Sequence, residues 1–84
     1  MNENAMLILL QDLQTAVTNG DYSTVQTIRD TRLVHALGKF DRSRNEAIDR
    51  VFKLSGRWWR GIDGTRFEVV QKAVDQALYL FQRA

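Results

Sequence analysis

Residues 43–56 read SRNEAIDRVFKLSG, and this stretch decides the fold of the chain. Its apolar side chains recur at three- and four-residue intervals, the period of one face of a helix. One face carries Ala47, Ile48, Val51, Phe52 and Ser55, and the other carries Arg42, Glu46, Asp49, Arg50 and Lys53. Asp41 or Ser43 can cap its start, and Ser43 with Glu46 forms a capping box. Gly56 is the predicted end of this helix.

Three more segments with helical periodicity flank this one. The first covers residues 4–18. The second runs from the capping box of Ser23 to Gly38, and its apolar stripe changes face, which predicts a break near residues 30–31. The last helix follows a capping box that begins at Thr65. The sequence therefore predicts an all-α fold, a compact bundle of four to five helices in a single domain, residues 1–84.

Composition sets the environment that we expect. The chain has 84 residues with no cysteine and no proline. Disulfides and cysteine zinc sites are excluded, and a reducing cytoplasm is the expected location. No apolar run is long enough for a signal peptide or a membrane span. Because burial and chain entropy nearly cancel in so small a domain, we expect a homodimer, with Leu7 and Ile8 at the self-association surface since they lie off the main apolar stripe.

Catalytic chemistry is not expected. His35 is the only histidine, so a catalytic dyad or a histidine metal cluster lacks a second member. Glu46 and Asp49 lie among basic residues, which is typical of surface ion pairs. Gly56 and Gly61 have the spacing of a phosphate-binding loop, but the Lys-Ser/Thr pair and the preceding strand are missing. We predict no metal, no cofactor and no enzyme activity.

The most informative segment is Arg57-Trp58-Trp59-Arg60. Adjacent tryptophans on a helix cannot both face one core, so either they form a lid over the helix ends or they contact a partner. Tryptophan and arginine are enriched at binding hot spots. We therefore expect a small interaction protein, of the regulator or inhibitor type, that binds another protein. The predicted contact residues are Arg57, Trp58, Trp59 and Arg60 with Arg42, Arg50 and Lys53.

The charge distribution keeps a second function open. Residues 1–30 carry four acids and one base, whereas residues 31–66 carry nine bases and four acids. Phosphate contacts from this basic region, with bases stacked on tryptophan, would make the chain a nucleic-acid-binding module. A helix-turn-helix reader is disfavoured, because a turn at Gly38 places Arg44 at an inward apolar position. Sequence-tolerant binding to nucleic acid remains the alternative.

Overall fold

The computed structural model describes residues 2–60 and 67–82, which fold into four α-helices and one short 3-10 helix. The elements are α1 (Glu3–Thr18), α2 (Tyr22–Thr31), η1 (Leu33–Ala36), α3 (Arg42–Arg60) and α4 (Phe67–Gln82). Strands are absent from the described part of the chain, so the all-α prediction is confirmed, with four α-helices.

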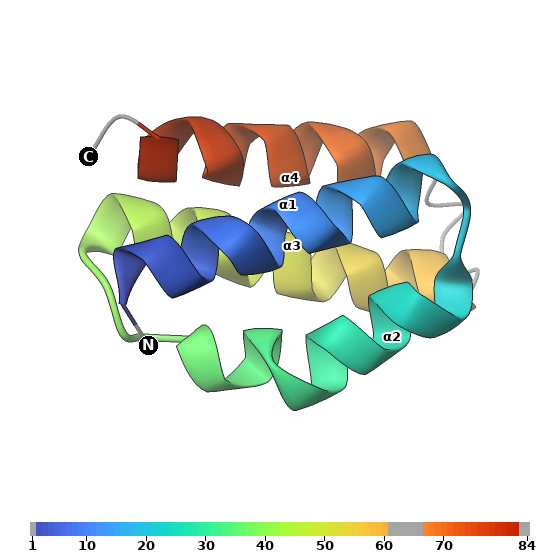
Figure 1. Ribbon diagram of the computed structural model, residues 1–84, viewed down its shortest axis with the longest axis horizontal. Helices are drawn as coiled ribbons and strands as arrows, with labels where there is room; N and C mark the ends of the chain where they lie inside the picture. The colour runs from blue at the N-terminus through green and yellow to red at the C-terminus, as the bar shows by residue number, and fades with distance from the viewer. Residues whose placement is uncertain (1, 61–66, 83–84) are drawn as a thin grey trace.

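The helices form an antiparallel bundle. Figure 1 shows that each α-helix runs against the one before it, with α1 between α4 and α2 in this view and α3 behind. α1 packs on α2 and α4, and α3 packs on the same two helices. The principal extents are 32 × 19 × 19 Å. This arrangement gives α3 two sides that contact other helices, one against α2 and one against α4.

The core is built from the apolar stripes that the sequence predicted. On α1 every predicted stripe residue is buried: Met6, Leu9, Leu10, Leu13, Ala16 and Val17. The α4 stripe is buried as Val70, Ala73, Val74, Ala77, Leu78 and Phe81. Phe67, which the same spacing predicts to be buried, is instead 41% exposed at the first turn of α4. Each fully buried large apolar side chain contributes about 1.5–3 kcal/mol relative to exposure. The aliphatic side chains of α1 and α4 thus form much of the interior.

The start of α2 differs from the prediction. Asp21, not Ser23, is its N-cap: the Asp21 carboxylate accepts hydrogen bonds from the Thr24 backbone N–H at 3.1 Å and from its hydroxyl at 2.6 Å. These bonds, the side-chain one foremost, lower the pKa of Asp21 below its ordinary value. Gly20 adopts φ +67° in the preceding turn, a conformation that favours glycine. The chain therefore enters α2 directly after the turn at Gly20, and Asp21 rather than Ser23 is at the N-cap position.

The predicted break in the second segment is confirmed. α2 ends at Thr31, and η1 covers Leu33–Ala36 as a separate 3-10 turn. Gly38 then takes φ +74° and reverses the chain toward α3. Asn45 secures this connection, because its amide accepts from the Phe40 backbone N–H at 2.9 Å and donates to the Phe40 carbonyl at 2.6 Å.

The predicted end of α3 at Gly56 is wrong. α3 continues to Arg60, so residues 57–60, which the sequence placed after the helix, are helical. A helix-ending glycine takes a positive φ, and Gly56 does not. The helix begins at Arg42, which leaves Asp41 at the preceding capping position and puts Ser43 inside the helix. The predicted capping box at Thr65 lies outside the described residues.

Candidate functional site

A groove runs between α3 and α4 on the outside of the bundle. Its volume is about 720 Å³. Its apolar residues are all half-buried: Ala47, Leu54 and Leu80. Its polar and charged lining is Ser43, Glu46, Asp49, Arg50, Lys53, Arg57 and Gln76. An apolar strip bordered by charges is the surface that an amphipathic helix of a partner protein needs.

Both acids of the groove are neutralised from within α3. Lys53 Nζ lies 2.9 Å from the Asp49 carboxylate, and Arg42 Nε lies 3.2 Å from that of Glu46. Each pair is one turn apart on an exposed face, so each contributes about 0.3–0.5 kcal/mol to the helix. The α4 wall, with Gln76 and Leu80, is uncharged. The charge that the groove presents therefore comes from α3 alone.

The predicted contact residues divide between two sides of α3. Arg50, Lys53 and Arg57 line the groove together. Arg42 lies at the start of the helix with a side chain that is 93% exposed, and its partner Glu46 lines the groove. Three of the seven predicted residues thus line one surface, and Arg42 is connected to it through Glu46.

Trp58 belongs to the core. It is 6% exposed, and its ring stacks on that of Tyr22 with centroids 4.3 Å apart and a tilt of 31°. The sequence left the tryptophans open between a lid and a partner contact, and for Trp58 the structure shows a core residue. Trp59 and Arg60 complete the last turn of α3, and their side chains lie outside the described part.

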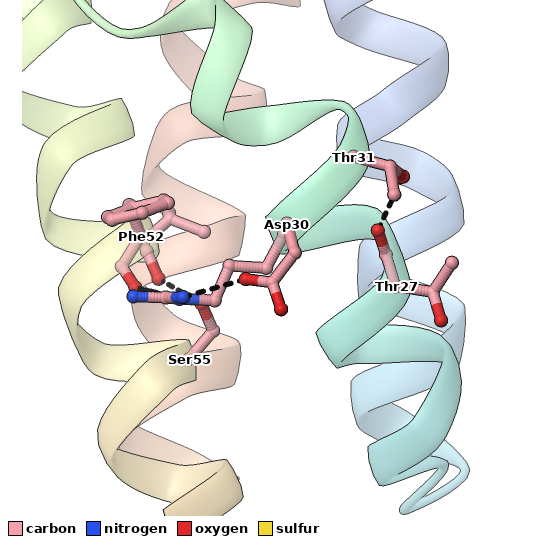
Figure 2. Close-up of polar contacts among 7 residues, drawn as sticks. Thr27, Asp30, Thr31, Phe52 and Ser55 are labelled. Carbon is pink, nitrogen blue, oxygen red and sulfur yellow. Dashed lines mark hydrogen bonds and ion pairs between the residues drawn. The ribbon is translucent and has the colours of Figure 1, made fainter.

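The α2 side of α3 holds an arginine that the sequence did not single out. Arg29 Nε donates to the Phe52 carbonyl at 2.8 Å, and its guanidinium lies 3.8 Å from the centre of the Phe52 ring. It also pairs with Asp30 at 2.9 Å. Figure 2 shows Phe52 and Ser55 on α3 facing Asp30 on α2 across this contact. No local signal predicts it, because Arg29 and Phe52 are 23 residues apart.

The basic region is interrupted by ion pairs. Arg32 pairs with Asp12 at 3.3 Å. Arg44 contacts Glu3 at 2.5 Å and Asp41 at 3.6 Å. With the pairs of Arg42 and Lys53, at least four of the nine basic residues of 31–66 contact a carboxylate among the described side chains, which do not include those of Arg60 and Arg66. Part of the positive charge predicted for this region is therefore compensated by carboxylates, while Arg50, Lys53 and Arg57 line the groove together.

The predicted self-association residues differ in exposure. Leu7 is half-buried and packs against the core, whereas Ile8 is 54% exposed on α1. His35 is exposed in η1. Among the described residues no three metal-ligating side chains come together, and no helix is both long and apolar enough to span a membrane.

Comparisons with known proteins returned no match among family models, curated proteins or solved structures.

Proposed function

We propose that the chain is a small non-catalytic regulator that binds another protein in the α3–α4 groove. The observation that carries this proposal is the apolar strip of Ala47, Leu54 and Leu80 beside the charged residues of α3, on the outer side of the bundle. A protein bound there would cover half-buried aliphatic surface, at about 25 cal/mol per Å² removed from water. Regulation then follows from occupying the partner's surface.

The groove favours a protein over a nucleic acid as its ligand. A nucleic-acid backbone requires several uncompensated cations on one surface. Here Glu46 and Asp49 stand among the basic residues of the wall, and they pair with Arg42 and Lys53. Apolar residues also form part of the lining, and phosphates gain nothing from them. Charges of both signs around an apolar strip suit a peptide segment.

The test is affinity capture from a cell extract with matched charge variants. Arg50→Glu with Arg57→Glu reverses two charges in the groove. Lys39→Glu with Lys72→Glu reverses two exposed charges outside it. We expect proteins that the parent chain and the Lys39/Lys72 variant capture, and that the Arg50/Arg57 variant loses. Identical capture by all three chains would reject the groove as the binding surface.

A DNA titration distinguishes the alternative function. Fluorescence anisotropy of a labelled duplex is measured with the parent chain and the Lys39/Lys72 variant at low and moderate salt. A protein-binding groove predicts no saturable DNA binding. Saturable binding that falls steeply with salt would replace this proposal by the nucleic-acid one, in which the basic region 31–66 contacts the phosphates.

We also infer that the chain forms a homodimer in a reducing, cytoplasmic environment, supported by its size, its lack of cysteine and the exposed Ile8. Ile8→Glu is the clean test because Leu7 packs against the core. We expect light scattering to give a dimer mass for the parent and a monomer mass for Ile8→Glu. A monomer mass for the parent chain at high concentration would reject the homodimer.

A further inference from the structure

A second pocket lies at the end of the bundle where the start of α4 faces the connection from α1 to α2 (Figure 1). Its volume is about 520 Å³, which is within the range of about 300–1,000 Å³ that small-molecule sites have. The lining combines the end of α1 with three aromatic side chains and one acid: Tyr22, Trp58, Phe67 and Glu68. The pocket shares no described lining residue with the α3–α4 groove, so a ligand here is independent of the proposed function.

Aromatic rings from three helices meet at this pocket. The Tyr22 ring of α2 stacks on that of Trp58 of α3 with centroids 4.3 Å apart, and Tyr22 remains 45% exposed. Phe67 at the start of α4 is 41% exposed. The buried Trp58 thus supports Tyr22, and Tyr22 and Phe67 offer exposed ring surface to one space. Because the face of an aromatic ring carries a negative partial charge, such a space attracts cations.

The end of α1 adds negative charge to the pocket. α1 ends at Thr18, and its last turn carries no basic side chain. The carbonyl groups at the C-terminus of a helix are equivalent to about half a negative charge. The opposite half-charges at the starts of α2 and α4 are met by acids, because Asp21 caps α2 and Glu68 lies in the first turn of α4. These helix ends therefore favour a cation over an anion.

Glu68 is the charged group of the pocket. Among the described lining residues it is the only side chain that is charged at neutral pH. It is exposed, and the ion pairs between described side chains do not include it. In the groove, by contrast, the Asp49 carboxylate pairs with Lys53 at 2.9 Å. A carboxylate beside two exposed aromatic rings suits a cation that has an apolar surface.

We propose that this pocket binds a quaternary ammonium group, the charged head of a small organic cation or of a trimethylated lysine side chain. The methyl groups of such a cation pack against the rings of Tyr22 and Phe67, while its charge lies near Glu68 and the end of α1. Because a quaternary ammonium has no N–H group, its contact with the rings leaves no hydrogen-bond donor unsatisfied.

The probe is choline, compared with neohexyl alcohol, its uncharged isostere with carbon in place of the nitrogen. Shifts of the backbone amides and indole N–H groups of the ¹⁵N-labelled chain map the site, and their titration gives Kd. We expect choline to shift the amides of Gly20 and Glu68 and the indole N–H of Trp58, and to bind about tenfold more tightly than the alcohol. A short peptide with trimethyllysine is the second arm, and the tighter of the two cations identifies the source of the ammonium group.

Two variants at exposed positions separate the contributions of charge and ring. Glu68→Gln and Phe67→Leu should each weaken choline about threefold and leave the affinity for neohexyl alcohol within about twofold. Glu46→Gln and Tyr79→Leu are the matched controls, because they remove an exposed acid and an exposed ring that do not line the pocket. Far-ultraviolet circular dichroism checks that each variant keeps its helices.

Three results would overturn this inference. Equal affinity for choline and neohexyl alcohol would make the site an apolar one. Unshifted pocket amides at about 0.1 M choline would show that the rings hold no cation, since an exposed cation–π contact with a carboxylate beside it should be detectable there. Unchanged choline affinity in both Glu68→Gln and Phe67→Leu would place the cation elsewhere. The proposed function fails separately, when capture from extract does not depend on the groove variants.

Discussion

Gly56→Ala measures how firmly α2 is fastened to α3. Gly56 lies inside α3, where alanine normally stabilises a helix by about 1 kcal/mol over glycine. A Cβ at this position, however, would lie 2.7 Å from Arg29 Nη2 and 2.9 Å from its Cζ. Real Cβ contacts are not this short, so either the guanidinium moves or the helix does. The sign of the stability change depends on what it costs Arg29 to move.

The contacts of Arg29 give the magnitude. Moving it loses the charged hydrogen bond to the Phe52 carbonyl, worth about 1.5–3 kcal/mol, and the stacking on the Phe52 ring, worth about 0.5–1 kcal/mol. The pair with Asp30 is half-exposed and contributes little. Subtracting the helix gain of about 1 kcal/mol, we expect Gly56→Ala to destabilise the chain by about 1–3 kcal/mol.

A double-mutant cycle isolates the interaction free energy between positions 29 and 56. In an Arg29→Ala chain the obstruction is gone, so Gly56→Ala should stabilise by about 1 kcal/mol. The coupling between the two sites is then about 2–4 kcal/mol. Urea unfolding followed by circular dichroism supplies all four free energies. Gly38→Ala is the control, because its cost comes from φ +74° with nothing near its Cβ and should be the same in both backgrounds.

The result that would refute this reasoning is a stabilising Gly56→Ala in the parent chain. A coupling under about 0.5 kcal/mol would likewise show that Arg29 moves aside freely. Its contacts with Phe52 would then contribute nothing to packing between α2 and α3.

Three further predictions follow from named contacts. Trp58→Ala should destabilise the chain by about 3–5 kcal/mol in urea unfolding, since Trp58 is a core residue; a change within 0.5 kcal/mol would contradict its burial. Asn45→Ala should lower the free energy of unfolding by about 1–3 kcal/mol and speed hydrogen exchange of the Phe40 amide. Unchanged exchange would show that the Asn45 side chain does not hold this amide. Asp21→Ala should lower the urea midpoint of unfolding at neutral pH. A group with a lowered pKa stabilises the fold only while it is ionised. The difference in midpoint between the parent and Asp21→Ala should therefore shrink as the pH falls below the ordinary aspartate pKa of about 3.9 and through the lowered pKa of the folded state. A deficit independent of pH would exclude the carboxylate as the cap.

The features that could be predicted from sequence are those with a local cause. The α1 stripe from Met6 to Val17 follows the helical period, and the break near residues 30–31 follows from a stripe that changes face. The burial of Trp58 had no such signal, because its neighbour Tyr22 comes from another helix. The same holds for the groove: its α3 residues were predicted as a charged face, but only packing brings Leu80 of α4 beside them.

Gly56 shows why a local rule can fail. Glycine after an amphipathic run usually ends a helix, since it accepts a left-handed conformation. Here it serves a long-range need, which is space for a guanidinium from α2. Ending a helix and making room for a neighbouring side chain both require a glycine, so the sequence near Gly56 does not distinguish them. They are distinguished only by a residue 27 positions away, Arg29.

The position of α3 implies that stability and recognition can be changed separately. Its α2 side, with Phe52 and Gly56, is held by Arg29, while its α4 side presents Arg50 and Arg57 to the groove. Side chains about half a turn apart on one helix share no direct contact, so their effects should add. Arg29→Ala should therefore lower the free energy of unfolding and leave the capture of partner proteins by the groove unchanged under folded conditions. Arg50→Glu should do the reverse, and a variant that moved both quantities together would show that the groove depends on the contact between α2 and α3.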